Sequence, residues 1–418
     1  MRFLVTTIGF VLAITIGSEF VSKVNQEMYS IAKDAKYLIY DVNLGEGFNL
    51  RRDVYMRVAN VVRLLRENGH NYILVLPPWG RLFHWDRQEV ALPWSTFFDV
   101  KSLNNFVPVI EFHEFLEKTS NSPIDDILYL QHYEEGWGSE YVMKFDERKC
   151  IRAPSTRQYS KNRETGGWDG WFFGVDNVHA KNFKCISIQG DSSTLQKLIL
   201  GNYSESQSIL IDRAETILHQ HYGDVNYWRA RRSMRYSQQL RQTADEFRRK
   251  LDPNSDISLA DDWRNEKNGE RLTKGGEYLG VHWRRRDFVA ARGNDIPSVK
   301  ETAKILNKLA KQQDVSKIYL ATDAKNEEVE ELERFLDENL EVFRFQNFEE
   351  FNDGQIAIID QWICAHAKFF IGTFESTFSF RIQEDREILG FPVDSTFNRL
   401  CPKVGVDCEQ PTKWKIVY

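Results

Sequence analysis

The sequence lacks the short motifs that mark the common phosphate-binding enzymes. It contains no G-x-x-x-x-G-K-[S/T] loop and no G-x-G-x-x-G turn, which argues against a nucleotide hydrolase and a nicotinamide-dependent dehydrogenase. It also contains no Asp-x-Asp pair, whose carboxylates often hold a divalent ion against a diphosphate. A diphosphate ligand of this protein would therefore need arginine to balance its charge.

A basic excess and paired metal-binding cysteines are also absent. The 418 residues carry a net charge of −6, which argues against a nucleic-acid-binding protein, whose surface normally has a broad basic excess. No C-x-x-C pair occurs and the nine histidines are scattered, so a zinc site has little support and we predict no metal. Hydrophobic residues at 42% and charged residues at 28% are ordinary for a globular protein, and the length is enough for two cores.

Long apolar runs are missing except at the N-terminus. Residues 1–18 have a basic start and an apolar run that ends in small residues, the pattern of a secretory signal peptide. A signal anchor is the alternative, but the run is short for a span of ~20 residues and Thr6 and Thr7 interrupt it. We therefore predict the secretory pathway and no membrane span after cleavage. The N-glycosylation sequon at Asn202 fits that route.

An oxidising compartment changes how the five cysteines are interpreted. Cys401 and Cys408 lie close together in a tail that contains proline and glycine, and Cys150 and Cys185 bracket a loop-rich segment. We predict the disulfides Cys150–Cys185 and Cys401–Cys408, although four cysteines permit three pairings. Cys364 lies in an apolar run and is predicted to be a buried free thiol.

Hydrophobic periodicity predicts strands that alternate with helices. Residues 37–42 and 72–76 are predicted strands, joined by a glycine-bearing turn and a helical pattern over residues 54–65. Residues 205–250 are predicted to be mostly helical. A second alternating pattern begins with a strand at 278–283.

The segment from Leu251 to Gly276 is polar and rich in turn residues, and we place the domain boundary at its start. Strands that alternate with helices predict parallel sheets with right-handed crossovers. We therefore predict an α/β protein with two Rossmann-like domains, residues 19–250 and 251–418, that face each other across a cleft.

Polar residues gather where the predicted strands end, which is where open α/β sheets bind ligands. The segments are 282–287, 322–323 and 372–378 in the second domain and 45–49 in the first. The arginines of 282–287 suit phosphate because the guanidinium can bond two oxygens together, and the hydroxyl residues after Gly372 suit a diphosphate at a helix start. A solvated basic turn and a Ser/Thr helix cap are the respective alternatives.

These segments resemble those of the GDP-fucose-dependent fucosyltransferases. Residues 282–287 read H-W-R-R-R-D, similar to the family's His-x-Arg-Arg-x-Asp motif. Residues 41–53, 76–81 and 360–367 closely resemble the protein O-fucosyltransferases, in particular the branch that acts on folded thrombospondin type 1 repeats. The resemblance covers essentially the whole chain after the predicted signal, and the motifs are specific in combination.

The resemblance implies an inverting, metal-independent glycosyltransferase of the two-Rossmann (GT-B) class that works in the lumen of the endoplasmic reticulum. Its donor would be GDP-fucose, and it would need no cofactor. Its partner would be a folded, disulfide-bonded protein that offers a Ser or Thr hydroxyl. An EGF-like repeat or a glycan as acceptor is one alternative, and a catalytically dead luminal binding protein of the same fold is another.

By the same resemblance Glu46 is the catalytic base and Arg284 stabilises the departing GDP. A base of near-neutral pKa would require partial desolvation of Glu46. Asp360 would recognise guanine through its adjacent N–H donors. The implied donor-site residues are Gly45, Glu46, Gly47, Phe48, Asn49, His282, Trp283, Arg284, Asp287, Asp360, Ser376, Thr377 and Phe378. The alternatives are a surface turn residue for Glu46, an ion pair with Asp287 for Arg284, and a helix-surface residue for Asp360.

The implied acceptor residues are Trp79, Trp85 and Asp385, with buried core as the alternative for the tryptophans. The chain departs from the family pattern twice. Residues 43–46 read Asn-Leu-Gly-Glu where Asn-Pro-Pro-Glu is expected, and Asp385 stands where glutamate is expected, which puts the role of Asp385 in doubt.

Overall fold

The computed structural model describes residues 35–418 apart from 81, 83–84, 86–90, 137, 139, 152–158, 255–270, 407, 409 and 412–414. The predicted signal peptide, residues 1–18, lies outside the described residues. Within the described ranges, no helix is both long enough and apolar enough to cross a bilayer.

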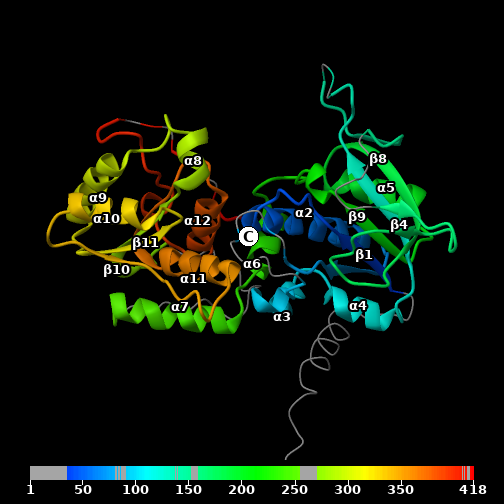
Figure 1. The fold of residues 1–418 in the computed structure, drawn as a ribbon, viewed down its shortest axis with the longest axis horizontal. Helices are drawn as coiled ribbons and strands as arrows, with labels where there is room; N and C mark the ends of the chain where they lie inside the picture. Colours follow the sequence, from blue (N-terminus) through cyan, green and yellow to red (C-terminus); the bar gives the residue numbers. More distant parts are fainter. Residues whose placement is uncertain are drawn as a thin grey trace, which may run out of the picture.

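The first sheet has the strand order β3-β2-β1-β9-β4-β8-β7-β6, with β5 beside β8 (Figure 1). Its strands are β1 (Lys36–Tyr40), β2 (Tyr72–Leu76), β3 (Val109–Glu111), β4 (Ile124–Gln131), β5 (Lys144–Glu147), β6 (Ser160–Lys161), β7 (Trp168–Asp169), β8 (Ala180–Gln189) and β9 (Ser208–Asp212). The six strands from β3 to β8 in that order run parallel, whereas β5, β6 and β7 pair antiparallel. The central strands are mostly apolar and buried because both faces of a parallel sheet are covered.

Helices of the first half are α2 (Phe48–Glu67), α3 (Val100–Leu103), α4 (Phe112–Lys118), α5 (Ser192–Asn202) and α6 (Val225–Ser233). Helix α2 follows β1 after a turn, and its apolar face is set by residues spaced three and four apart. These are Val54, Val58, Val61, Val62 and Leu65, all 0% exposed. This packing fixes the start of α2, and with it the turn that carries Glu46.

The second sheet has the order β12-β11-β10-β13, with all pairs parallel. Its strands are β10 (Gly276–Trp283), β11 (Lys317–Thr322), β12 (Glu341–Phe343) and β13 (Ala367–Ile371). The helices are α7 (Gln238–Leu251), α8 (Arg286–Ala291), α9 (Val299–Gln313), α10 (Asn326–Phe335), α11 (Asp353–Ala365) and α12 (Thr377–Leu389). The parallel second sheet and the mostly parallel first sheet, both with helices between their strands, confirm the predicted α/β class.

The position of α7 bears on the domain boundary. This helix precedes residue 250 almost entirely, yet it packs against α11 and β10 of the second sheet (Figure 1). The Trp362 indole of α11 donates a 2.7 Å hydrogen bond to Asp245 of α7. The boundary at residue 250 stays a prediction, and these contacts favour a division ahead of α7.

The structure contains both predicted disulfides, Cys150–Cys185 and Cys401–Cys408. Cys364 is a buried free thiol, as predicted. The first disulfide joins the segment after β5 to β8 in the first sheet. The second lies beyond α12, beside the edge strand β13.

Candidate active site

The polar groups of the second half meet where β10, β11 and β13 end. Arg284 follows β10, and its guanidinium forms ion pairs with Asp323 after β11 at 3.0 Å and with Asp287 at 2.6 Å. The Arg284 and Asp323 side chains are only 17% and 16% exposed, whereas Asp287 is 50% exposed. Arg284 therefore does form the ion pair with Asp287 that was considered as its alternative role. It also forms a less exposed ion pair with Asp323.

The other arginines of this segment are also held in place. Arg285 is buried and bonds Glu328 at 2.8 Å, and its backbone N–H donates to Asp323 at 2.6 Å. The Arg286 side chain donates to the Asp323 carbonyl at 3.1 Å. The segment is therefore an ordered cation cluster anchored on Asp323, rather than a solvated basic turn.

His282 is buried under Phe378 at the end of β10. The two rings stack with centroids 4.3 Å apart, and His282 Nδ1 lies 2.8 Å from Ser379 Oγ. Burial and then the Arg284 charge lower the pKa of His282 to about 3. The imidazole is therefore neutral at neutral pH and offers hydrogen bonding without positive charge.

The turn between β13 and α12, residues 372–376, approaches this cluster closely. A Cβ on Gly372 would lie 2.5 Å from Ser379 Oγ, so only glycine fits there. Thr373 Oγ1 donates to the His282 carbonyl at 2.7 Å and accepts from the Arg284 backbone N–H at 2.9 Å. We call residues 372–376 the β13–α12 turn.

Helix α12 starts at the end of this turn. Ser376 is its buried N-cap residue, but the Ser376 side chain accepts no hydrogen bond from the first turn of α12, all of which the structure describes. Thr377 is exposed at the helix start. The first amides of α12 therefore lack a side-chain cap, which suits an anion better than the helix-cap alternative does.

Asp360 lies on α11 beneath β11. Tyr319 of β11 donates a 2.5 Å hydrogen bond to its carboxylate. Burial raises the pKa of Asp360 to about 7, although the Tyr319 hydrogen bond lowers it. Asp360 is therefore a half-buried, hydrogen-bonded carboxylate, and its role toward guanine stays a prediction.

Glu46 lies in the turn between β1 and α2 in the first half. The Glu46 backbone N–H donates to the Asn43 carbonyl at 3.0 Å, and the Glu46 carbonyl accepts from Arg51 Nε at 3.1 Å. Partial burial raises the pKa of Glu46, and the Glu215 charge raises it further, while nearby arginines lower it. A raised pKa is what a general base for a hydroxyl needs.

Sequence reasoning missed Glu215 because it assigned residues 205–250 mostly to helix. In the structure, Ser208–Asp212 is strand β9, paired between β1 and β4. Glu215 follows β9, and its Oε2 accepts a 3.2 Å hydrogen bond from the Asn43 backbone N–H. The run Ser-Ile-Leu-Ile-Asp has the length of a buried strand, and this was the available signal.

Four other predicted site residues are buried in the protein interior. Phe48, Trp79 and Trp85 are 6%, 2% and 5% exposed and belong to one aromatic cluster. Trp283 is 1% exposed in the core of the second half. The buried-core alternative for the two tryptophans agrees with these values, while their acceptor role stays a prediction.

Asn49 and Asp385 belong to a buried polar network between the halves. Asn49 Oδ1 accepts from Gln361 at 2.8 Å, and Gln361 Oε1 accepts from Arg52 at 2.7 Å. Asp385 is 7% exposed, and its carboxylate pairs with Arg231 at 2.6 Å. These contacts connect α2 and α6 with α11 and α12, so they hold the halves together whether or not the residues also touch a ligand.

The two sheets with their covering helices form two Rossmann-like halves, which is the GT-B fold that was predicted. The crystal structure of POFUT1 in complex with GDP-fucose superposes with a TM-score of 0.56 over 90% of this chain and 99% of that chain. Its sequence identity is 15%, so this likeness shows the fold alone.

The sequence profile described as O-FucT, GDP-fucose protein O-fucosyltransferase, matches residues 37–389. GDP-fucose protein O-fucosyltransferase 2 of Caenorhabditis elegans is 60% identical over 95% of this chain and 94% of the relative. The Homo sapiens protein of that name is 45% identical over 93% and 91%. The chain therefore belongs to the GDP-fucose protein O-fucosyltransferase family. It is a glycosyltransferase with GDP-fucose O-fucosyltransferase activity, so the alternative of a dead binding protein falls.

Proposed function

We propose that this enzyme inverts the fucose anomeric carbon, needs no metal, and transfers fucose to Ser or Thr of folded thrombospondin type 1 repeats. The observation that carries the mechanism is the raised pKa of the partly buried Glu46 carboxylate in the turn after β1, while Arg284 follows β10 in the other half. The acceptor rests on the resemblance of the strand-end motifs and on relatives named O-fucosyltransferase 2.

The proposed reaction is a single displacement. The acceptor oxygen forms a bond to C1 of fucose from the face opposite GDP while the bond from C1 to the diphosphate oxygen breaks. Glu46 accepts the hydroxyl proton, and GDP departs with the bonding electrons. This geometry inverts C1 and leaves no covalent enzyme intermediate.

The charge that builds on GDP is met by the second half. Arg284 is positioned by Asp323 and by the Thr373 hydroxyl, so it needs little reorganisation when the diphosphate gains charge. The uncapped start of α12 supplies backbone N–H groups. Among the described residues, no group of three or more His, Cys, Asp or Glu is arranged to hold a metal ion. Metal independence is tested directly by the experiment below.

Guanine recognition is assigned to Asp360. An ionised carboxylate can accept two neighbouring N–H donors of the base, and the burial of Asp360 strengthens such bonds. The Tyr319 hydroxyl holds one carboxylate oxygen in a fixed direction.

The test is transfer of labelled fucose from GDP-fucose to a folded thrombospondin type 1 repeat, with chelator present throughout. Wild type is run beside Glu46→Gln and Arg284→Ala, with Glu67→Gln as a matched surface control. We expect wild type and the control to transfer fully, and Arg284→Ala to lose about 10²–10³ in rate. Loss of transfer in chelator would refute metal independence.

An EGF-like repeat and a free glycan serve as competing acceptors in the same assay. Preference for either over the thrombospondin repeat would refute the acceptor and leave the donor site standing. Product analysis of the anomeric configuration decides inversion independently.

We also propose that the enzyme acts in the lumen of the endoplasmic reticulum and carries a glycan on Asn202. The two disulfides suit an oxidising compartment, and Asn202 is exposed at the end of α5. Protein from a secretory host should lose mass on endoglycosidase treatment, and Asn202→Gln should abolish that loss. Absence of a mass change in wild type would refute the modification.

A further inference from the structure

The β13–α12 turn has a neighbour outside the predicted site. Strand β13 is the edge of the second sheet, and residues 398–400 extend that edge where the turn begins. The Gly372 N–H donates to the Asn398 carbonyl, and the Leu400 N–H donates to the Gly372 carbonyl, both at 2.9 Å. Residues 398–400 therefore bond both the N–H and the carbonyl of Gly372, the first residue of the turn.

Arg399 is the middle residue of the segment 398–400 and pairs with Gly372. Its guanidinium carbon is 3.9 Å from the centroid of the Phe374 ring, in cation–π contact with the third residue of the turn. The Arg399 side chain is largely buried, where such a contact is stronger than on an open surface. The next residue, Glu375, has a left-handed φ of 48° and so needs outside support to hold its conformation.

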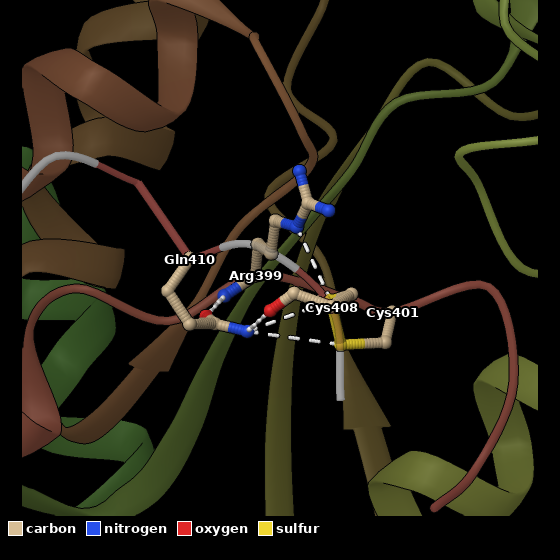
Figure 2. The surroundings of a disulfide bond; sticks show 4 residues. All are labelled: Arg399, Cys401, Cys408 and Gln410. Carbon is tan, nitrogen blue, oxygen red and sulfur yellow. Dashed lines mark hydrogen bonds between the residues drawn. A yellow bond between two sulfur atoms is a disulfide. The ribbon is translucent and has the colours of Figure 1, made fainter. Parts of the chain in front are cut away.

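The disulfide Cys401–Cys408 lies next to Arg399 and bonds its side chain, as Figure 2 shows. Arg399 Nε donates to Cys408 Sγ at 3.2 Å, and the Arg399 backbone N–H donates to Gln410 Oε1 at 3.0 Å. Gln410 in turn donates to the Cys408 carbonyl at 3.2 Å. Without the covalent link to Cys401, Cys408 and Gln410 would no longer be held beside Arg399, which would lose both hydrogen-bond partners together.

We propose that Arg399, locked in place by the Cys401–Cys408 disulfide, is a positioning residue that holds the β13–α12 turn in the conformation that binds the donor diphosphate. The proposal rests on the proposed donor site. Thr373 connects the turn to the arginine segment, because its hydroxyl bonds both the His282 carbonyl and the Arg284 backbone N–H. A shift of the turn therefore moves the backbone that carries the phosphate-binding arginine.

The experiment measures the Kd for GDP by calorimetry and the KM and kcat with GDP-fucose for four variants. These are Arg399→Ala, Arg399→Lys, the double variant Cys401→Ala/Cys408→Ala, and Cys150→Ala/Cys185→Ala as the matched disulfide control. We expect Arg399→Ala and the Cys401/Cys408 variant to raise both Kd and KM about tenfold with a smaller change in kcat. Arg399→Lys should restore part of the affinity because it keeps the cation. The control should bind GDP as wild type does, because its disulfide lies in the other half.

Hydrogen exchange of the peptide over residues 370–378 is followed in the same variants without ligand. Faster exchange in Arg399→Ala together with weaker GDP binding supports the proposal. Unchanged exchange and unchanged Kd would overturn it, as would an equal loss of affinity in the control. Faster exchange with wild-type GDP affinity would show that Arg399 holds the turn but that the turn is not the diphosphate site, which overturns the donor placement specifically.

Discussion

Arg231 of α6 and Glu384 of α12 form an ion pair between the two halves, with 2.6 Å between Nε and Oε2 and side chains 2% and 0% exposed. Glu384 also accepts a 2.5 Å hydrogen bond from the Tyr227 hydroxyl and pairs with Arg381 at 2.9 Å. One carboxylate thus compensates two buried guanidinium groups. Figure 1 shows both helices between the sheets, so this pair ties the halves into one unit.

The first prediction concerns this pair. Glu384→Ala leaves two arginines buried without their shared carboxylate, and we expect it to lower the free energy of unfolding by about 3–5 kcal/mol. Urea unfolding of the disulfide-intact protein measures the change. The control is Glu67→Ala, whose 55%-exposed carboxylate pairs with Arg63 and should contribute less than about 1 kcal/mol. Equal small changes in both variants would contradict a stabilising role for the buried pair.

The second prediction concerns Glu215. Its negative charge raises the pKa of Glu46, so Glu215→Gln should lower that pKa. Because the proposed base Glu46 can accept a proton only when ionised, the acidic limb of the kcat profile should then move to lower pH. The glutamine oxygen can still accept the Asn43 N–H, which limits the change to charge. A limb that stays fixed or moves to higher pH would show that Glu46 is not the titrating base.

Much of the fold follows from hydrophobic periodicity. Strands β1, β2, β10 and β11 were predictable because each is a short apolar run that ends in polar residues or, for β2, in two prolines. Strand β9 was not predicted, because the three apolar residues between Ser208 and Asp212 carry no periodicity that separates a buried strand from a helix. Only its pairing between β1 and β4 decides it, and that pairing is a long-range property.

The site shows the same division. The cation cluster at Arg284 and the turn at Gly372 were predictable because strand ends collect ligands. The role of Asp323 as the anchor of the cation cluster was not predictable, because it depends on β10 and β11 lying side by side. Aromatic residues are ambiguous for another reason: a tryptophan has the same sequence signal in a groove and in a core, and only the 2% exposure of Trp79 separates the two.

The third prediction concerns the pH dependence of donor binding. Burial raises the pKa of Asp360 to about 7 in the ligand-free protein. In the proposed donor site, the N–H donors of guanine bind the ionised form of this carboxylate. The affinity for GDP should therefore rise with pH through about 7 and then level off. Asp360→Asn should bind GDP more weakly and lose this rise, which calorimetry between pH 5.5 and 8.5, ~1.5 units on either side of 7, would measure.

Stability provides an independent check on the same carboxyl. The pKa of Asp360 is raised in the folded protein from the unfolded value of 3.8 to about 7. The stability that this shift contributes is fully present below pH 3.8 and is lost as pH rises through about 7. The ligand-free wild type should therefore lose more stability than Asp360→Asn between pH 5 and 7, a window of ~2 units below the raised pKa. Parallel stability curves for the two proteins would contradict the raised pKa.

The fourth prediction decides between the two roles considered for Trp85. Its ring lies among Phe48 and Phe97, and a Cβ on Gly354 of α11 would come within 2.6 Å of it. A side chain packed this tightly between the halves acts through stability. We expect Trp85→Ala to cost about 3–5 kcal/mol of unfolding free energy, and Trp85→Phe less, while the KM for acceptor in Trp85→Phe stays within about twofold of wild type.

The matched control for Trp85 is Phe97→Leu, a change in the same cluster at a residue with 0% exposure and no assigned contact to acceptor. If Trp85 is core, the two variants lose stability and keep the KM for the folded repeat in the same way. If Trp85 instead contacts the acceptor, Trp85→Phe raises that KM by about tenfold or more at unchanged stability, whereas Phe97→Leu does not. The second pattern would return Trp85 to the acceptor site and require the cluster to open when the repeat binds, because a ring that is 5% exposed has almost no surface to offer in the closed form.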